Sequence, residues 1–107
     1  MAKYLILGAY SVEGHKGLLK SGGSARREAI SKLMESVGGR LEAFYFVFGT
    51  DDYVLIVDAP DNVSTAAVAL TVAASGAVQG FRTAVLLTPE EVDQATKKTV
   101  AYRPPGQ

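Results

Sequence analysis

The stretch of sequence that decides the fold is RLEAFYFVFGTDDYVLIVDA, residues 40–59. Its first part, residues 40–48, is rich in aromatic and aliphatic side chains, a composition that favours a β-strand. Gly49-Thr50-Asp51-Asp52 then supplies turn chemistry, and residues 53–57 are again apolar and β-branched. The stretch therefore predicts an antiparallel hairpin of two strands.

Short apolar segments on both sides of the hairpin predict the rest of a small sheet. Two of them, residues 3–9 and 81–87, have the length and composition of strands. Between the strands, apolar residues recur at helical spacing in two segments. We expect the first helix to begin at a Ser24 cap, and the second to run from about Asp61 to about Ser75.

Three segments lie outside this pattern. Residues 10–23 are rich in Gly, Ser and Lys and predict a long irregular connection, a kind of segment that often carries function. Thr88-Pro89-Glu90-Glu91 has the form of a capping box with proline at the first helical position, so it predicts a short C-terminal helix. We expect a single domain over residues 1–101, followed by a loose tail over residues 102–107.

The predicted order of strand, helix, strand, strand, helix, strand is a ferredoxin-like βαββαβ pattern. The fold class is therefore α+β, with a four-stranded antiparallel sheet and two helices on one face. Alternate residues of a strand point to opposite faces, yet Leu5 and Leu7 on one face and Ile6 on the other are all apolar. We expect a second copy of the chain to cover the open face, which makes the protein a homo-oligomer. A monomer that covers this face with its own tail is the alternative.

The composition excludes several classes of partner and cofactor. The 107 residues include 11 basic and 11 acidic side chains, so the chain lacks the positive field that attracts nucleic acid or an anionic membrane. No cysteine is present, which removes disulfides, thiolate nucleophiles and iron–sulfur clusters. No apolar segment is long enough for a spanning helix or a signal core. We expect a cytoplasmic protein with no nucleic-acid or membrane partner, no metal and no cofactor.

A few polar side chains are candidates for a ligand site. His15 is the only histidine and could act as a base or a ligand, or be an exposed loop residue. Tyr10 and Tyr45 could line a cavity and offer phenol groups, and Arg82 could hold an anionic group, whereas core packing is the alternative for all three. Asp52 could be a partly buried acid or only a turn residue. His15, Tyr45 and Asp52 are the candidates for catalysis.

Four basic residues surround the approach to the first helix: Lys16, Lys20, Arg26 and Arg27. The start of a helix presents free N–H groups, so this basic cluster could bind an anionic effector. The segment lacks the order of glycines and lysine that defines a phosphate-binding loop. A solvated, charged surface is therefore the simpler interpretation.

Several segments in a fixed order resemble the GYD-domain family. They are Tyr10-Ser11-Val12-Glu13-Gly14, Gly38-Gly39 before the aromatic strand, Gly49-Thr50-Asp51-Asp52 and Asp58-Ala59-Pro60-Asp61. The chain departs from the family's glycine, variable residue, tyrosine, aspartate signature, because Asp51 stands at the tyrosine position. The resemblance implies a fold similar to the dimeric α/β barrel proteins, in which two ferredoxin-like sheets pack face to face. It implies no defined biochemical activity.

Three functions are compatible with the sequence. The first is an oligomeric binding or accessory protein that holds a small molecule between helices and sheet. The second is a cofactor-independent enzyme of the dimeric barrel type, which acts on a small hydrophobic or aromatic substrate by proton transfer; it rests on analogy of fold. The third is a regulatory protein that binds an anionic effector at the basic cluster. They differ in where a cavity should lie and in which side chains should converge on it.

Overall fold

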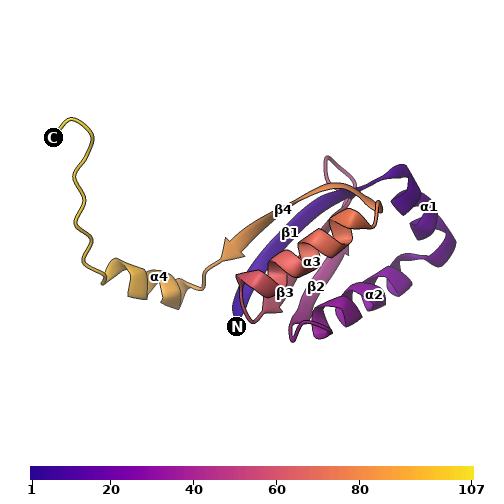
Figure 1. Cartoon of the computed structure of the whole chain (residues 1–107), viewed down its shortest axis with the longest axis horizontal. Coiled ribbons are helices and arrows are strands. Elements are labelled where there is room, and N and C mark those ends of the chain that lie inside the picture. Colours follow the sequence, from indigo (N-terminus) through magenta and orange to yellow (C-terminus); the bar gives the residue numbers. More distant parts are fainter.

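The computed structural model describes all 107 residues and contains one four-stranded antiparallel sheet. The strands are β1 (Ala2–Tyr10), β2 (Arg40–Phe46), β3 (Tyr53–Ala59) and β4 (Val78–Leu86), in the spatial order β2-β3-β1-β4. The helices are α1 (Val12–Ser21), α2 (Gly23–Glu35), α3 (Asn62–Ala74) and α4 (Pro89–Thr96). The predicted ferredoxin-like α+β fold is confirmed, with α2 and α3 against one face of the sheet and a short helix after β4 (Figure 1).

Most predicted elements lie close to their expected positions, because their end signals are local. The Asp61 side chain caps α3 by accepting a hydrogen bond from a backbone N–H of its first turn at 2.7 Å. A complete capping box joins Thr88 and Glu91 at the start of α4. The hairpin forms as predicted, although β2 ends at Phe46 and β3 continues to Ala59.

The prediction of a long irregular connection over residues 10–23 is wrong, because most of that segment forms α1. Ser11 caps this helix, with its side-chain oxygen accepting a hydrogen bond from Gly14 N at 3.1 Å. The same hydroxyl donates a hydrogen bond to a carbonyl oxygen of the loop before β4 at 2.6 Å. Gly14 is needed for this docking, because any side chain there would collide with the Ala77 carbonyl oxygen. These tertiary contacts stabilise a helix that local composition does not favour.

A glycine between α1 and α2 sets where the second of these helices begins. Gly22 has a φ of +85°, a left-handed conformation that residues with a side chain rarely adopt. α2 therefore begins at Gly23, and Ser24 lies inside its first turn instead of capping it. The expectation of a Ser24 cap is wrong for this reason.

The hydrophobic core lies between the helices and one face of the sheet. Met34 of α2 and Val57 of β3 are at its centre and are almost completely buried. The other buried apolar members are Tyr4, Tyr10, Ile30, Tyr53, Leu55, Ala59 and Val68. All the strand residues in this core point toward the helices, so the second face of the sheet adds nothing to it.

No helix packs on the other face of the sheet, which we call the open face (Figure 1). The strand register places three rows of side chains across it. The middle row is Ala43, Ile56, Leu5 and Ala84. The flanking rows are Arg40, Asp58, Lys3 and Leu86 at one end, and Tyr45, Val54, Leu7 and Arg82 at the other. The open face is thus apolar in its middle and carries charges toward both ends.

A buried carboxylate organises one charged end of the open face. Asp58 is only 8% exposed, and it accepts hydrogen bonds from Lys3 Nζ at 3.0 Å and Arg40 Nη2 at 2.8 Å. Lys3 also pairs with Glu42 at 2.6 Å. The hydrogen bond from Lys3, followed by that from Arg40, holds the pKa of Asp58 below its ordinary value, although burial opposes this effect.

The protein should lose stability in acid when Asp58 becomes protonated. A carboxyl group with a lowered pKa in the folded chain stabilises the fold above its unfolded-state value of about 3.9, and this contribution is lost as the pH falls through the folded-state value. Asp58→Asn should therefore lower the melting temperature at pH 7, and the difference from the wild type should shrink below pH 4. Melting curves measured from pH 2 to 7 check this. The other carboxyl groups are common to both proteins, so a constant difference over the whole range would contradict the prediction.

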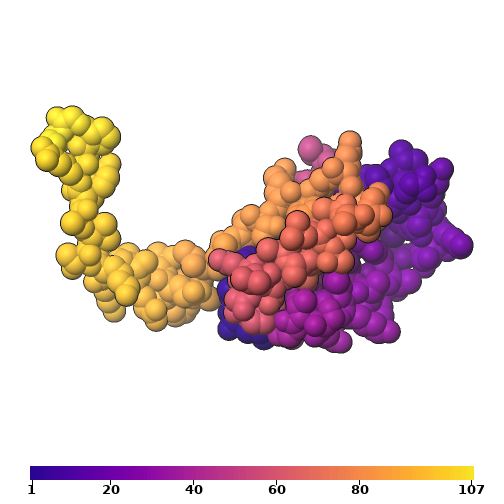
Figure 2. Space-filling view, in the orientation of Figure 1, coloured from indigo at the N-terminus to yellow at the C-terminus, as the bar shows by residue number.

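The C-terminal residues stand away from the body of the molecule, as Figure 2 shows. We call residues 87–107 the C-terminal arm, and neither α4 nor the segment after it packs substantially on the sheet. The radius of gyration is 17.0 Å, whereas a compact chain of this length has about 13 Å. The larger apolar side chains of the C-terminal arm are all exposed, namely Leu87, Val92, Val100 and Tyr102. None of the helices, including α4, has the length and apolar character needed to cross a membrane.

Candidate functional site

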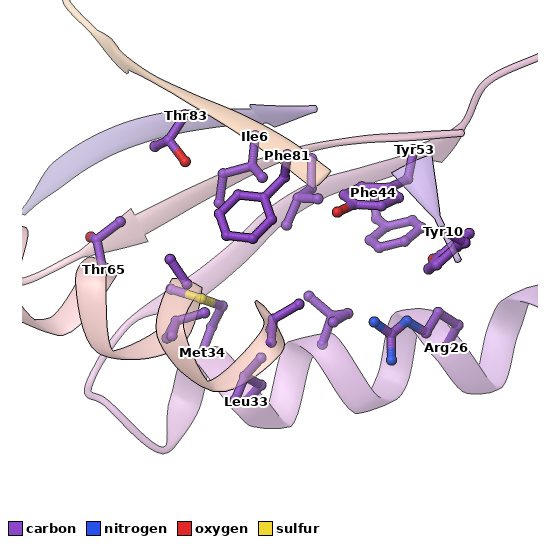
Figure 3. Close-up of a pocket in the computed structure, with 15 residues that line it drawn as sticks. Ile6, Tyr10, Arg26, Leu33, Met34, Phe44, Tyr53, Thr65, Phe81 and Thr83 are labelled. Carbon is purple, nitrogen blue, oxygen red and sulfur yellow. The ribbon is translucent and has the colours of Figure 1, made fainter. Parts of the chain in front are cut away.

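A cavity lies between α2, α3 and the face of the sheet that they cover (Figure 3). We call it the apolar cavity, because twelve of its fifteen lining residues are hydrophobic. Its volume is about 50 Å³. This is enough for a few waters or a short apolar group.

Alternate residues of the strands and one stripe of each helix form the walls of the apolar cavity. Ile6 from β1, Phe44 from β2 and Phe81 from β4 point into it from the sheet (Figure 3). The helices contribute Ile30, Leu33 and Met34 from α2, and Thr65, Val68, Ala69 and Val72 from α3. The two helices pack on the sheet but hardly on each other, so the cavity extends between them.

Arg26 of α2 is the one charged residue in the wall of the apolar cavity. Its guanidinium carbon lies 5.6 Å from the centre of the Tyr10 ring. Its Nε is buried without a hydrogen-bond partner, and no carboxylate forms an ion pair with it. A buried donor left unpaired costs about 1–3 kcal/mol, and more when the group is charged. The hydrogen-bonding capacity of Arg26 is therefore not satisfied within the chain.

Two tyrosine rings lie beside Arg26 at the same end of the cavity. Tyr10 and Tyr53 are 4% and 6% exposed, and their ring centres are 5.0 Å apart. Burial raises the pKa of Tyr53 to about 12, and burial also raises the pKa of Tyr10 against the opposing effect of Arg26. Both phenols therefore keep their protons at neutral pH and can donate a hydrogen bond.

A second and wetter cavity adjoins the first one, between α1 and α2. Its volume is about 320 Å³, and only five of its eleven lining residues are hydrophobic. Tyr10 and Arg26 line both cavities, so they form a shared wall. A ligand at this wall could place an apolar end in the first cavity and a polar end in the second.

The structure brings three of the predicted site residues together beside this wall. His15 Nε2 lies 3.4 Å from Asp52 Oδ2, and the His15 ring meets the Tyr10 ring edge-on at 5.8 Å between centres. Asp52 Oδ2 also accepts a hydrogen bond from Tyr10 N at 2.9 Å. His15 Nδ1 lies 3.0 Å from the Ser11 carbonyl oxygen, so acceptor oxygens face both ring nitrogens. His15 and Asp52 have no third acidic, histidine or cysteine neighbour that would complete a metal site.

Tyr45 and Arg82 do not join this group. Both lie on the open face, where Tyr45 is 69% exposed. Arg82 donates a hydrogen bond to Asp51 at 2.9 Å, and together they form an ion pair. Asp51, which stands at the signature tyrosine position, is therefore a partner of Arg82 and not a residue of the cavity.

Sequence reasoning misses Arg26 and Tyr53 as cavity residues. The basic cluster suggests a surface role for Arg26, but α2 turns it inward, while Lys16 stays exposed in a pair with Glu13 at 3.6 Å. A signal for Arg26 does exist, since it precedes the buried Ile30 by four residues and so lies on the same helical stripe. Tyr53 likewise shares the period of two with the buried residues of β3.

Comparison with known proteins bears on the fold and the family. Among solved structures, the chain is similar to one described as "crystal structure of FFRP-DM1", with a TM-score of 0.53 and 16% identity over 81% of this chain and 100% of that chain. At this level of identity, the likeness concerns the fold alone. No curated protein matches the sequence significantly. The family model described as "GYD domain" matches residues 4–96, which is most of the chain, and the protein therefore belongs to the GYD domain family.

Proposed function

We propose that this GYD-domain protein binds a small, largely apolar molecule in the apolar cavity. The observation that carries the proposal is the lining, in which twelve of fifteen residues are hydrophobic and the polar ones are few. Binding sites for small molecules typically combine an apolar lining with a small number of polar groups that orient the ligand. Arg26, Tyr10 and Tyr53 would have that role at one end of the cavity.

The proposal includes assembly with a second copy of the chain through the open face. Ile56 and Leu5 lie side by side on adjacent strands in the apolar middle of that face. Uncovered apolar surface of this kind marks interaction sites in proteins. The charged pairs at both ends, Lys3 with Asp58 and Arg82 with Asp51, resemble the polar rim of an interface. Two such faces packed together would form the second core that a single chain lacks.

Xenon is a suitable probe for the cavity, because it is small and carries no polar group. In methyl NMR spectra of the wild-type protein under xenon pressure, the signals of Ile30 and Val68 should shift. Ala69→Leu adds volume inside the cavity and should abolish the response. Ala66→Leu makes the same change at an exposed position of α3 and should preserve it. A wild-type spectrum that does not respond to xenon would contradict the proposed site.

Native mass spectrometry of the purified protein tests the proposed assembly and detects a ligand that stays bound. The expected spectrum shows a multimer, with the added mass of any ligand that remains bound through purification. A clean monomer would contradict the proposed assembly.

A catalytic function is the second candidate, because His15 and Asp52 contact each other and Tyr10, which lines the cavity, although His15 and Asp52 do not line it themselves. A histidine beside a carboxylate and a phenol that can donate its proton are groups used in general acid–base catalysis. The protein would then be a cofactor-independent enzyme that moves a proton on a small hydrophobic or aromatic substrate. An enzyme would turn its ligand over, and His15→Gln would stop turnover while binding persists. A binding protein would return the ligand unchanged.

A further inference from the structure

We propose that the ligand is a monocarboxylate with a short apolar body, and that Arg26 recognises its carboxylate at the wall between the two cavities. This inference rests on the proposed function and adds to it the charge of the head group. It also places the anion site in the interior of the fold, and not at the exposed basic cluster.

The first support is the unpaired state of Arg26. Arg40 and Arg82 each hold a carboxylate at 2.8 or 2.9 Å. Arg26 has no such partner, and its buried Nε lacks an acceptor. The Nε and Nη groups of a guanidinium form a planar fork that matches the two oxygens of a carboxylate. One carboxylate would therefore satisfy both the charge and the donors of Arg26.

The second support is the position of Arg26 between an apolar and a wet cavity. A carboxylate at Arg26 can leave its hydrocarbon part in the apolar cavity and keep contact with water in the wet one. The small volume of the apolar cavity limits the hydrocarbon part to a few carbon atoms. The phenols of Tyr10 and Tyr53 lie at the same wall and can donate further hydrogen bonds.

The groups around the wall determine which sign of charge the head group of the ligand should carry. Glu13, which lines the second cavity, pairs with Lys16, and Asp52 lies against His15 and the Tyr10 N–H and lines neither cavity. Arg26 is the one charged residue that lines both cavities, and its positive charge attracts an anion and repels a cation. A single guanidinium offers one charge, which matches a carboxylate better than a phosphate dianion.

Three probes with five carbon atoms each and different head groups test this inference. Pentanoate is an anion, pentanamide is neutral and pentylammonium is a cation. In NMR titrations of the wild-type protein, pentanoate should bind at least tenfold more tightly than pentanamide, and pentylammonium should not bind. Signals of the cavity methyl groups and of the Arg26 side chain give the readout.

Two variants assign the preference to Arg26. Arg26→Met keeps much of the length of the side chain but removes its charge, so pentanoate should lose its advantage while pentanamide still binds. Retained pentanamide binding also shows that the variant has folded with its cavity intact. Arg27→Met is the matched control, because Arg27 lies next to Arg26 on the same helix, is exposed and lines neither cavity. It should leave all three titrations unchanged.

Each other outcome has a definite meaning. Equal binding of pentanoate and pentanamide to the wild type would overturn the inference and leave the proposed function in place. An advantage for pentanoate that survives Arg26→Met would overturn the role of Arg26. If none of the probes binds and xenon also causes no shift, the proposed function fails together with the inference.

Discussion

Replacing Ile56 by glutamate is expected to dissociate the proposed oligomer into monomers. Ile56 lies in the middle row of the open face, in register with Leu5 on β1 and Ala43 on β2. A carboxylate at this position would be buried without a cation when two open faces pack together, and breaking charge balance in this way costs about 3–5 kcal/mol. The dissociation constant should rise by at least about two orders of magnitude. Native mass spectrometry across a dilution series measures this rise.

Leu70→Glu is the matched control for this prediction. Leu70 lies on α3, is 72% exposed and points away from the sheet, so its replacement introduces the same charge outside the proposed interface. The control should assemble like the wild type. An unchanged assembly mass for Ile56→Glu, in a variant whose melting curve shows a folded protein, would exclude the open face as the interface.

Replacing Gly8 by alanine is expected to destabilise the fold by about 1–3 kcal/mol, the range seen when a packed core receives extra atoms. A methyl group at Gly8 would collide with the Tyr53 hydroxyl and with the carbonyl oxygen of Gly80. The Tyr53 ring cannot turn aside easily, because it is buried against Tyr10. Relief of the collision would therefore disturb either the β1–β4 pairing or the polar end of the cavity. Urea denaturation measures the change.

Gly80→Ala, on the neighbouring strand β4, is expected to stabilise the fold. A methyl group at Gly80 would meet no atom within 4 Å. The usual effect of replacing a strand glycine by alanine then applies, which is a gain of roughly 0.5–1 kcal/mol. The two substitutions should thus change the free energy of unfolding in opposite directions. If both substitutions changed the free energy of unfolding in the same direction, the contact with Tyr53 would not be what excludes a side chain at Gly8.

The parts of the fold that could be predicted are those with signals in the local sequence. The caps at Asp61 and Thr88 and the alternation of apolar residues along the strands depend on neighbours within a few positions. The helix α1 could not be predicted in this way. Its two glycines lower its helical propensity, and it is held by Ser11 and Gly14 against the loop before β4, more than sixty residues away in sequence.

The approach of Asp52 to Tyr10 was within reach of sequence reasoning, because strand pairing sets it, whereas His15 joins them only through α1. β1 runs antiparallel to β3, so the end of β1 lies beside the hairpin turn, and Asp52 N donates a hydrogen bond to the Gly8 carbonyl oxygen at 2.7 Å. The separation of Tyr45 follows from the period of two, because Phe44 already occupies the cavity side. The inward direction of Arg26 depends on the rotation of α2 about its axis, which packing on the sheet determines.

The slight contact between α2 and α3 affects how selective the cavity can be. Each helix is anchored by the sheet and not by the other helix, so the two can move apart while both keep their anchors. If the cavity holds the proposed ligand, such walls would widen to suit it, and discrimination by the size of the ligand would be weak. The elements that would stay in place are Tyr10 and Tyr53, whose buried rings lie on β1 and β3 and not on the helices. Such a receptor would accept a chemical class of guests, graded by their polar ends, rather than one compound.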